Sequence, residues 1–408
     1  MSKRIIIVNV HFAPFSFGGA TIVAEELALR LQKAHDWAVL VFTVFNDPLA
    51  PPYARRRYRA KGLDILAVNY PHNASSKDSY CNPQMETSFV EVFEAFQPDV
   101  CHLHSIQNIG AGILAFLADK ACKSVVTLHD CWWLCDRQFM IDRDGFYCDQ
   151  VKINPEVCSY CVENVEKSEA RLDYLTEQLK HADLLLAPSE FQRALYIANG
   201  YDQTRCVTNK NGINHPEDSY IEKRRQRLAT AEKITFGFVG GPGRIKGSDV
   251  IVAAFNTIAS KDYQLLIVDA AANLGSTWKN GSYWDVPGEV QEVGAYSQDS
   301  MDDFFSRIDV LLFPSQWKES FGLVVREALA RDVWVIATGE GAVAEDIRDG
   351  ENGTLLPLTE DSSYLSVAIE SLINGDQWKG YRDRYSHNIR SFDEQAVELN
   401  QILHSLVS

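Results

Sequence analysis

Short apolar runs alternate along the chain with segments of helical periodicity. The runs RIIIVNV (4–10), AVLVFTVF (38–45) and ITFGFVG (234–240) are apolar and rich in β-branched residues, which is typical of strands buried on both faces. The segment GATIVAEELALRLQKA (19–34) instead repeats its apolar residues at i, i+3 and i+4, the period of an amphipathic helix. This alternation predicts parallel sheets with helices on both faces.

The alternation forms two series, separated by a polar segment at 213–232. Further strands of the first series are expected at 98–105, 124–130, 182–189 and 205–212. Those of the second are expected at 263–270, 309–315 and 333–339, with helices at 247–260, 301–308 and 322–331. Because 408 residues are too many for one ordinary core, the sequence predicts two domains joined near 213–232.

We therefore expect an α/β protein with two doubly wound, Rossmann-like domains. The first would span 1–212, with a cysteine-rich insertion at 131–161, and the second would span 213–385. A terminal helix within 386–408 could pack on either domain, including back on the first.

The composition is that of a soluble globular protein, with 46% hydrophobic and 23% charged residues. No stretch approaches the roughly 18 uninterrupted apolar residues of a membrane-spanning helix. The start of the chain has basic residues but only a short apolar run and no small-residue cleavage site, so no signal peptide is expected. A cytoplasmic protein is the expected class.

The chain is acidic, with a formal net charge of -16. This excess argues against general nucleic-acid binding. One segment, YARRRYRAKG (53–62), nevertheless carries five basic residues and no acidic one. It is interpreted either as a solvated loop or helix face, or as a contact with anionic lipid head groups at the inner face of a membrane, where each Lys or Arg gains about 1 kcal/mol.

Five of the nine cysteines lie in one short window, 131–161. Without an export signal we expect reduced thiols. Four of them, which include a C-x2-C pair, suit a tetrahedral structural zinc site: Cys135, Cys148, Cys158 and Cys161. Disulfides within the window and merely buried thiols are the alternatives, and a catalytic role is not expected.

Loops at the carboxyl ends of the strands are candidate ligand sites, because open parallel sheets bind ligands there. Gly18 and Gly19 follow the first strand, immediately before a helix. In the second series, FGFVGGPGRIKGSD (236–249) is a glycine-rich turn that leads into a helix beside Arg244 and Lys246, which suits a phosphate. Its spacing is neither that of the P-loop nor that of the dinucleotide fingerprint, and a tight turn with two solvated cations is the alternative.

Two glutamates, Glu319 and Glu327, flank an apolar segment in WKESFGLVVREALA (317–330). If a helix starts near Phe321 or Gly322, Glu319 lies in the loop before it and Glu327 lies within its first two turns. Carboxylates accept well from vicinal hydroxyls, so one glutamate could hold a sugar and the other a ribose of one extended ligand. The structural alternative for Glu327 is an acid favoured by the helix dipole.

These segments together resemble a glycosyltransferase of the GT-B fold, in the large retaining family numbered four and named for its E-x7-E motif. Glu319 and Glu327 meet that motif within PSQWKESFGLVVREALA. Further similar segments cover most of the chain: FAPFSFGGATIVAEEL, PDVCHLHS, VVTLHDCWWLC, LLLAPSEFQ, NKNGI, KGSDVIVAAF and EDIRDGENGTLLPL. The cysteine window and the interdomain segment are only loosely covered, although a subgroup of the family carries similar cysteines after H-D-x-W.

The resemblance implies two domains that face each other across a cleft and a nucleotide diphosphate sugar as the donor substrate. Glu327 would hold the ribose hydroxyls, and Glu319 would contact the transferred sugar. Backbone N–H groups near Phe321, Gly322 and Leu323 would hold the sugar hydroxyls or the diphosphate.

The resemblance also assigns the cations of the glycine-rich turn. Lys246 lies at the place of the family's phosphate lysine, six positions after Gly240. The family has an arginine directly after that glycine, where this chain has Gly241, so Arg244 would take that role from another point of the loop.

In the first domain, Gly18 and Gly19 match the family's N-terminal glycine loop, which approaches the phosphates. His104 and His129 end two strands, where an isolated histidine is often a structural hydrogen-bonding group. The family's use of a His-Asp pair at this place implies that His129 contacts the sugar or positions the acceptor. For His104 both interpretations stay open, and Asp130 is expected to orient the loop or contact the acceptor.

The implied reaction is transfer of the sugar, with retention at the anomeric carbon, to a glycan, lipid-linked or small-molecule acceptor in surface polysaccharide, lipopolysaccharide or glycoconjugate synthesis. Lys246, Arg244 and the helix start would stabilise the leaving phosphate, which could itself take the acceptor proton. No DxD-type motif lies at a strand end in the right context, so no catalytic metal is expected. The alternatives are a hydrolysing sugar-nucleotide epimerase, a phosphorylase of the same fold, and a non-catalytic sugar-nucleotide binder.

Overall fold

The chain folds into two compact units. The computed structural model describes residues 2–16, 18–241, 243–269 and 283–408, so residue 242 of the glycine-rich turn and residue 270, the expected end of a strand, lie outside the described residues. Unit 1 comprises Met1–Arg143, Asp149–Gly212 and Phe392–Ser408, and unit 2 comprises Asp144–Cys148 and Ile213–Ser391. Each unit is built on its own mainly parallel sheet, so the predicted doubly wound α/β fold is confirmed.

Unit 1 contains an eight-stranded sheet in the order β3-β4-β2-β1-β5-β6-β7-β8. Its strands are β1 (Arg4–Val8), β2 (Ala38–Phe45), β3 (Arg55–Ala60), β4 (Leu63–Asn69), β5 (Val100–Leu103), β6 (Lys123–Thr127), β7 (Leu184–Ala187) and β8 (Cys206–Thr208). The central strand β1 pairs in parallel with β2 and β5. Residues 5–8 are fully buried, as a strand covered on both faces requires.

The strand order of unit 1 changes direction at β1, so right-handed crossovers place helices on both faces of the sheet. These helices are α1 (Gly18–Ala34), α2 (Pro83–Phe96), α3 (Ile113–Asp119), α4 (Pro155–Cys158), α5 (Val165–Lys180) and α6 (Glu190–Ala198). α1 ends where the helical periodicity of the sequence at 19–34 ends and starts one residue before it.

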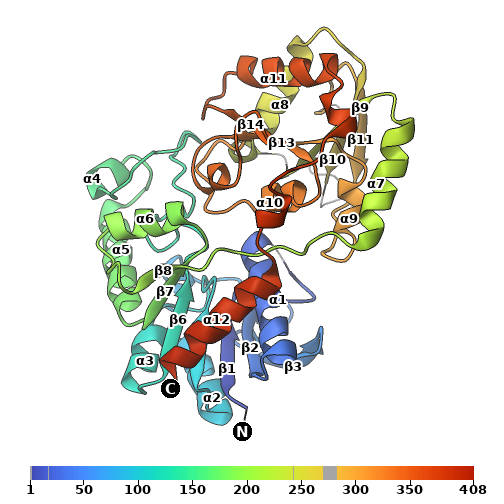
Figure 1. Cartoon of the computed structure of the whole chain (residues 1–408). Helices are drawn as coiled ribbons and strands as arrows, with labels where there is room; N and C mark the ends of the chain where they lie inside the picture. Colours follow the sequence, from blue (N-terminus) through green and yellow to red (C-terminus); the bar gives the residue numbers. More distant parts are fainter. Residues whose placement is uncertain (1, 17, 242, 270–282) are drawn as a thin grey trace. The chain divides into compact units, whose positions relative to one another are not determined.

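The last helix, α12 (Phe392–Leu406), belongs to unit 1 and packs on α1 (Figure 1). The Trp37 indole N–H donates to Asn400 Oδ1 over 2.8 Å. On the helix itself, Leu399 and Leu403 are fully buried. The helix therefore completes the hydrophobic core of the first unit after the chain has passed through the second.

The basic segment at 53–62 contains a strand, which corrects its interpretation as a loop or helix face. β3 pairs antiparallel with β4 at the edge of the sheet, with Ala60 opposite Leu63. The two residues between them, Lys61 and Gly62, both have positive φ, 53° and 85°, as a type I′ hairpin turn requires. The pattern of hydrophobic residues did not reveal this strand, because its side chains are mostly charged, as suits an edge strand that must not pair with other chains.

Most cations of this segment are paired with carboxylates of unit 1. The four ion pairs are Arg55–Glu91, Arg56–Asp47, Arg59–Asp64 and Lys61–Glu25. Among the described residues, none forms an ion pair with the fifth cation, Arg57. The local positive charge is therefore smaller than the sequence suggested, and the lipid contact stays a prediction.

Unit 2 contains a six-stranded parallel sheet in the order β11-β10-β9-β12-β13-β14. Its strands are β9 (Ile234–Val239), β10 (Tyr263–Val268), β11 (Glu289–Val293), β12 (Val310–Phe313), β13 (Trp334–Thr338) and β14 (Gly353–Leu356). The chain leaves β9 toward β10 on one side, whereas β12 pairs with β9 on the other. The carboxyl ends of β9 and β12 therefore form a topological switch point, where such sheets bind ligands.

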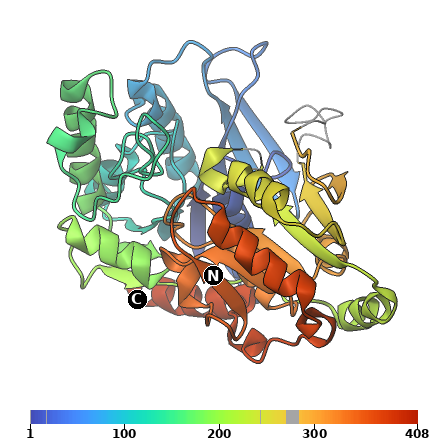
Figure 2. The same ribbon diagram turned by 90° about the horizontal axis from the view of Figure 1, so that it is seen from above.

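The helices of unit 2 include one in the polar segment that was expected only to join the domains. The helices are α7 (Asp218–Thr230), α8 (Ser248–Thr257), α9 (Met301–Phe305), α10 (Leu323–Leu329) and α11 (Ser363–Asn374). α8 and α11 lie side by side (Figure 2). On α7, buried Arg224 donates to the carbonyls of Ile308 and Asp332, so this segment is part of the second unit.

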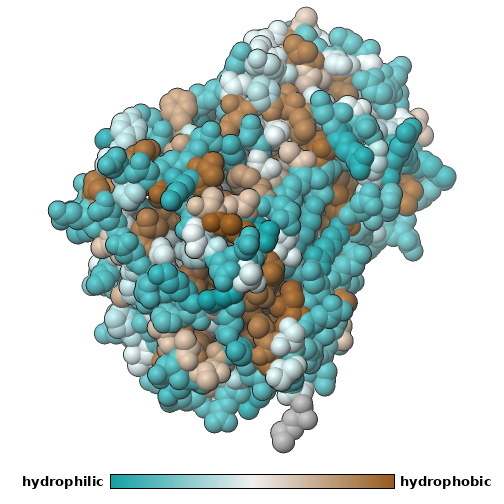
Figure 3. Space-filling view, turned by 60° about the vertical axis from the view of Figure 1, so that its left-hand side comes forward, coloured by the Kyte–Doolittle hydropathy of each residue, from teal (hydrophilic) through white to brown (hydrophobic). Residues whose placement is uncertain are grey.

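Hydrophilic residues cover much of the face shown in Figure 3, with apolar residues scattered among them. Large apolar side chains that are exposed occur at separate places along the chain, for example Leu49, Ile221 and Val367. Single exposed apolar residues of this kind are normal on a folded chain. Within the described part of the chain, no helix has the length and hydropathy to cross a membrane.

Truncation of a buried leucine on α12 tests whether this helix completes unit 1. Leu403→Ala should lower the free energy of unfolding by about 2–5 kcal/mol, because it leaves a cavity in the core. Val397→Ala on the same helix is the matched control, since Val397 is 46% exposed. Its truncation should cost less than about 0.5 kcal/mol. Equal urea midpoints for the two variants would contradict the packing of α12 on unit 1.

Candidate functional site

In unit 2, two loops start side by side at the carboxyl ends of β9 and β12. The first is the glycine-rich turn after Val239, and the second runs from Pro314 to Gly322, directly before α10. The Gln316 N–H donates to the carbonyl of Ile245 over 2.8 Å, which joins the two loops through their backbones.

Gly247 permits the close approach of these loops. Its φ is 73°, and a Cβ placed on it would lie 2.0 Å from the carbonyl oxygen of Pro314. A side chain here would therefore collide with backbone, which cannot turn away as a flexible side chain can. Gly247 was not predicted as a site residue. A signal was available, because Gly247 starts the expected helix at 247–260, and a glycine at such a position can adopt a left-handed backbone.

Three hydrogen-bond donors converge on one oxygen of Glu319. Lys246 Nζ lies 2.8 Å from Glu319 Oε1, and the Ser315 hydroxyl and the Trp317 indole N–H each donate to the same oxygen over 2.9 Å. Hydrogen bonds to an ionised group are about twice as strong as those between neutral groups, so this cluster fixes the carboxylate. The structure thus brings together Glu319 and Lys246, two residues predicted from different loops.

The backbone of Glu319 is held by a third loop, which follows β13. Glu319 forms an isolated parallel bridge with Gly341, and the Ala342 N–H donates to the Glu319 carbonyl over 2.9 Å. A Cβ on Gly341 would lie 2.8 Å from the same carbonyl oxygen, so this approach also depends on a glycine. Thr338 Oγ1 adds a hydrogen bond of 2.8 Å to the carbonyl of Ser315.

Arg326 holds two of these loops together. Its side chain is buried and pairs with Asp346 over 2.6 Å. It also donates to the carbonyl of Ala342 over 2.5 Å and to that of Phe321. This role was not predicted, because a single arginine in a helical segment is most often solvated.

Glu327 is the fifth residue of α10 and is buried. Burial raises its pKa, and the charge of Arg331 opposes that rise. Its carboxylate oxygens lie 3.4 Å from Gln298 Nε2 and 3.5 Å from the Tyr296 hydroxyl, which are long distances for hydrogen bonds. A buried carboxylate with such weak partners can accept a further hydrogen bond from a ligand hydroxyl.

The start of α10 lies between the two glutamates, as the sequence suggested. Phe321 is buried, Gly322 precedes the helix, and Leu323 is the first helical residue. Glu319 therefore lies in the loop and Glu327 in the helix. Whether the backbone at 321–323 binds a ligand stays a prediction.

The glycine-rich turn carries both predicted cations, in different surroundings. The turn begins with Gly240 and Gly241, directly after β9. Lys246 points its Nζ at Glu319, whereas the guanidinium of Arg244 forms two hydrogen bonds with Glu360, one of them 2.7 Å long. Arg244 would have to exchange this partner for a phosphate, so its predicted role is less direct than that of Lys246.

In unit 1, the predicted glycines open the first helix. Gly18 and Gly19 are the first two residues of α1, and both are exposed. The helix therefore starts one residue earlier than expected. A phosphate contact by these glycines stays a prediction.

The two predicted histidines of unit 1 lie together. His104 follows β5, His129 follows β6, and the Nδ1 atom of the first is 2.8 Å from the Nε2 atom of the second. A third histidine, His102, lies beside them, with its ring centroid 4.1 Å from that of His104. Burial lowers the pKa of His104 well below its usual value and lowers the pKa values of His102 and His129 to about 3, so all three are neutral near pH 7.

Asp130 holds its own loop in unit 1. Its Oδ1 accepts from the Trp132 N–H over 2.8 Å, and its Oδ2 accepts from Gln138 Nε2 over 2.6 Å. Burial raises its pKa, whereas these hydrogen bonds lower it. Both carboxylate oxygens bond to the loop, as an orienting residue would, and contact with an acceptor stays a prediction.

The cysteine window does not form a recognisable metal centre in the described residues. No group of three or more His, Cys, Asp or Glu there could hold a metal ion. Cys148 belongs to unit 2, whereas Cys135, Cys158 and Cys161 belong to unit 1. The structural zinc site therefore stays a prediction from cysteine spacing, which the metal content of the purified protein would decide.

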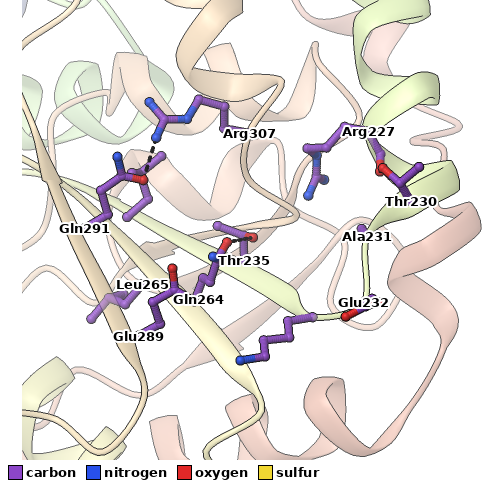
Figure 4. Close-up of a pocket in the computed structure, with 12 residues that line it drawn as sticks. Arg227, Thr230, Ala231, Glu232, Thr235, Gln264, Leu265, Glu289, Gln291 and Arg307 are labelled. Atoms are coloured by element: carbon purple, nitrogen blue, oxygen red, sulfur yellow. Dashed lines mark hydrogen bonds between the residues drawn. The ribbon is translucent and has the colours of Figure 1, made fainter.

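A cavity of about 490 Å³ lies elsewhere in unit 2, and none of the predicted site residues lines it (Figure 4). It is found at the amino ends of β9, β10 and β11, where Thr235, Gln264 and Glu289 lie in one register row. This is the end of the sheet opposite to the one where such sheets bind ligands.

Two cations that line this cavity already have protein partners. Arg227 pairs with Asp309. Arg307 donates to Gln291 Oε1 over 2.7 Å, as Figure 4 shows. An anionic ligand at either arginine would have to displace these partners, although Lys233 also lines the cavity. The cavity is therefore a weaker candidate than the loops at the carboxyl ends of β9 and β12.

A glycine-to-alanine pair tests the close approach of the two loops in unit 2. Gly247→Ala should lower the free energy of unfolding by more than the roughly 1–2 kcal/mol that a left-handed backbone costs an alanine, because its Cβ also meets the Pro314 carbonyl. Gly350→Ala is the matched control, since Gly350 has a φ of 75° but a Cβ there would meet no atom within 4 Å. Equal losses in urea unfolding would show that the loops can separate without cost.

The pH dependence of unfolding tests the neutral histidines of unit 1. Because the folded pKa of each is below the unfolded value of about 6.5, protons bind preferentially to the unfolded chain. The stability is fully present above about pH 6.5 and should fall as the pH is lowered toward 3, by up to about 1.4 kcal/mol per pH unit for each histidine. His104→Asn should flatten this dependence, whereas the same change at exposed His72 should not. Identical pH slopes for the two variants would contradict the prediction.

Two sequence families match the chain, one in each half. Residues 17–216 match the family described as Glycosyltransferase Family 4. Residues 219–392 match the family described as Glycosyl transferases group 1. Together the two matches leave out only the chain ends and the short segment between them.

Three similar proteins illustrate these matches. The D-inositol 3-phosphate glycosyltransferase of Corynebacterium jeikeium is 21% identical over 91% of this chain and 89% of its own. The capsular polysaccharide biosynthesis glycosyltransferase CapM of Staphylococcus aureus is 25% identical over 58% of this chain and 63% of its own. The crystal structure of Anabaena HepE in complex with UDP-glucose has a TM-score of 0.66 at 16% identity, covering 98% of this chain and 99% of its own.

Proposed function

Because the chain is a glycosyltransferase of the GT-B fold and of the family-four type, we propose that it transfers a sugar from a nucleotide diphosphate sugar to a hydroxyl acceptor with retention at the anomeric carbon. The observation that carries the proposal is the pairing of Glu319 and Lys246 at the carboxyl ends of β9 and β12. One group can accept from sugar hydroxyls and the other can neutralise a phosphate, so the loop pair offers both functions within one site.

Lys246 is the residue that would act on the leaving group. Negative charge develops on the diphosphate as the bond to the sugar breaks, and a fixed cation stabilises this charge more in the transition state than in the ground state. The lysine side chain is 30% exposed, so it can leave Glu319 and turn to a phosphate. Arg244 would support it after exchanging Glu360 for the ligand.

The two glutamates would divide the donor between them. Glu327 would accept hydrogen bonds from the ribose, since it is buried and has only long contacts with Gln298 and Tyr296. Glu319 would accept from a hydroxyl of the transferred sugar. Their separate positions, one in the loop and one in the helix, suit neighbouring parts of one extended molecule.

No residue near Glu319 is required as a strong base in this scheme. The bond between the anomeric carbon and the phosphate oxygen breaks, the acceptor oxygen bonds to that carbon on the same face, and the leaving phosphate takes the acceptor proton. The products are a glycoside and a nucleoside diphosphate. His129, Gly18 and Gly19 of unit 1 are proposed to serve the sugar, the acceptor or the phosphates.

The similar proteins indicate where to begin the search for substrates. HepE is crystallised with UDP-glucose, which makes uridine nucleotides the first donors to test. CapM is named for capsular polysaccharide synthesis and the corynebacterial enzyme for an inositol phosphate, so both glycan and small-molecule acceptors are candidates. We propose surface polysaccharide or glycoconjugate synthesis as the pathway class.

Turnover of nucleotide sugars by lysine variants tests the proposal. A thermal-shift panel first identifies the donor, because a ligand at 100 times its Kd stabilises the native state by about 2.7 kcal/mol. Lys246→Ala should then lower kcat about 100- to 1,000-fold, as expected for loss of a group that stabilises developing charge. Lys223→Ala, which removes an exposed lysine paired with Asp303, is the matched control and should leave turnover unchanged.

Acceptor-dependent release of nucleoside diphosphate distinguishes transfer from the other reactions of this fold. Release of free sugar or an epimer without an acceptor would indicate hydrolysis or epimerisation instead. Full activity of Lys246→Ala in a folded protein would overturn the assignment of this site.

A further inference from the structure

Trp317 stands two residues before Glu319 and has no role in the scheme above. We propose that Trp317 is a positioning residue for Glu319. Its indole N–H, together with the Ser315 hydroxyl, keeps one carboxylate oxygen of Glu319 hydrogen-bonded. The other oxygen is therefore presented to the transferred sugar when Lys246 turns to the diphosphate. This role rests on the proposed function and explains how the same site stays ordered during donor binding.

The two carboxylate oxygens of Glu319 are used unequally. Oε1 receives all three hydrogen bonds, from Lys246, Ser315 and Trp317, at 2.8–2.9 Å. Within the described part of the chain, Oε2 accepts no hydrogen bond, since all those that Glu319 accepts through its carboxylate end on Oε1. A carboxylate can accept about four hydrogen bonds in total, so the second oxygen retains its full accepting capacity.

The three donors differ in how firmly they are held. Ser315 is 2% exposed and Trp317 is 5% exposed, whereas the side chain of Lys246 is 30% exposed. An arriving diphosphate can therefore attract the lysine away from Glu319 while the two neutral donors stay. Without them, the departure of the cation would leave a buried carboxylate with no partner on either oxygen, which is costly.

The indole is better suited to this task than a hydroxyl. Its N–H can only donate, so it cannot reverse its role when the charge next to it changes. The loop that carries it is held on both sides of Trp317, by the Gln316 N–H on the Ile245 carbonyl and by the Ala342 N–H on the Glu319 carbonyl. The centroid of the Trp317 ring also lies 5.6 Å from Lys246 Nζ, within the range of a cation–π attraction.

Trp317→Phe removes the indole N–H but keeps an aromatic ring, so it tests the hydrogen bond separately from the packing of the ring. Trp317→Phe should lower kcat/KM for the donor about 10- to 100-fold, the loss expected for a hydrogen bond to a charged group. The loss should appear mainly in kcat, because the sugar contact is misplaced in the transition state. Affinity for the free nucleoside diphosphate, which lacks the sugar, should change by less than about twofold, because the phosphate and ribose contacts remain.

Donor analogues that each lack one sugar hydroxyl distinguish a positioning role from a merely structural one. A structural role of Trp317 would leave unchanged the factor by which kcat/KM falls when a hydroxyl is removed. In the unmodified protein, one analogue should lose at least about tenfold in kcat/KM, because Glu319 can no longer accept from it. In Trp317→Phe the same analogue should lose less than about threefold, since the two changes remove one interaction and are not additive. An unchanged penalty in the variant would overturn the proposal.

Trp334→Phe is the matched control. Its indole N–H also donates to a side-chain oxygen, Thr354 Oγ1 at 3.1 Å. Trp334 is the first residue of β13, at the end of that strand opposite to the loop that contacts Glu319. This variant should retain the kinetics of the unmodified protein, so that a general cost of losing an indole is excluded.

A second variant covers the case in which Trp317→Phe does not fold. Ser315→Ala removes the other neutral donor with a smaller change in volume and should show the same loss in kcat and the same reduced analogue penalty. If the unmodified protein turns over no nucleotide sugar, the proposed function fails and this role fails with it. The other case is that the unmodified protein turns over its donor and both variants fold. If Trp317→Phe and Ser315→Ala then keep kcat/KM within about twofold of the unmodified protein, only the positioning role fails, because the loss of a hydrogen bond to a charged group should cost more.

Discussion

The site in unit 2 depends on the parallel pairing of β9 with β12, which starts two loops from neighbouring points on one sheet edge. Pairing alone brings the backbones near each other, and the missing side chain at Gly247 lets them touch. Once the loops are in contact, Lys246 from one can reach Glu319 from the other. A strand order that placed another strand between them would separate the cation from the carboxylate, whatever the residues in the loops.

Much of this arrangement could be predicted from the sequence. The apolar runs at 38–45 and 234–240 correspond to β2 and β9, because strands buried on both faces leave a continuous apolar signal. Glu319 and Glu327 were predicted from their resemblance to the E-x7-E motif. Lys246 was predicted from the glycine-rich turn, because open parallel sheets bind ligands at the carboxyl ends of their strands. The loop-to-helix division of the two glutamates followed from the same reasoning.

Contacts between distant residues could not be predicted in this way. Arg326 resembles a surface residue until its partners Asp346 and Ala342 are known, since its burial depends on the surrounding loops and not on its own helix. The basic strand β3 was missed for a related reason: its arginines find partners such as Glu91 and Asp47 elsewhere in unit 1. A charge run carries no information about the carboxylates that will neutralise it.

The return of α12 to unit 1 has a consequence for how the protein is made. During synthesis the ribosome releases the other segments of the first unit long before its last helix, so the surface that receives Leu399 and Leu403 stays open while the second unit emerges. The second unit, apart from 144–148, is one continuous stretch and can fold without waiting for a later segment. Maturation of unit 1 is thus tied to the synthesis of α12, and a product terminated before this helix would expose an apolar surface to chaperones and proteases.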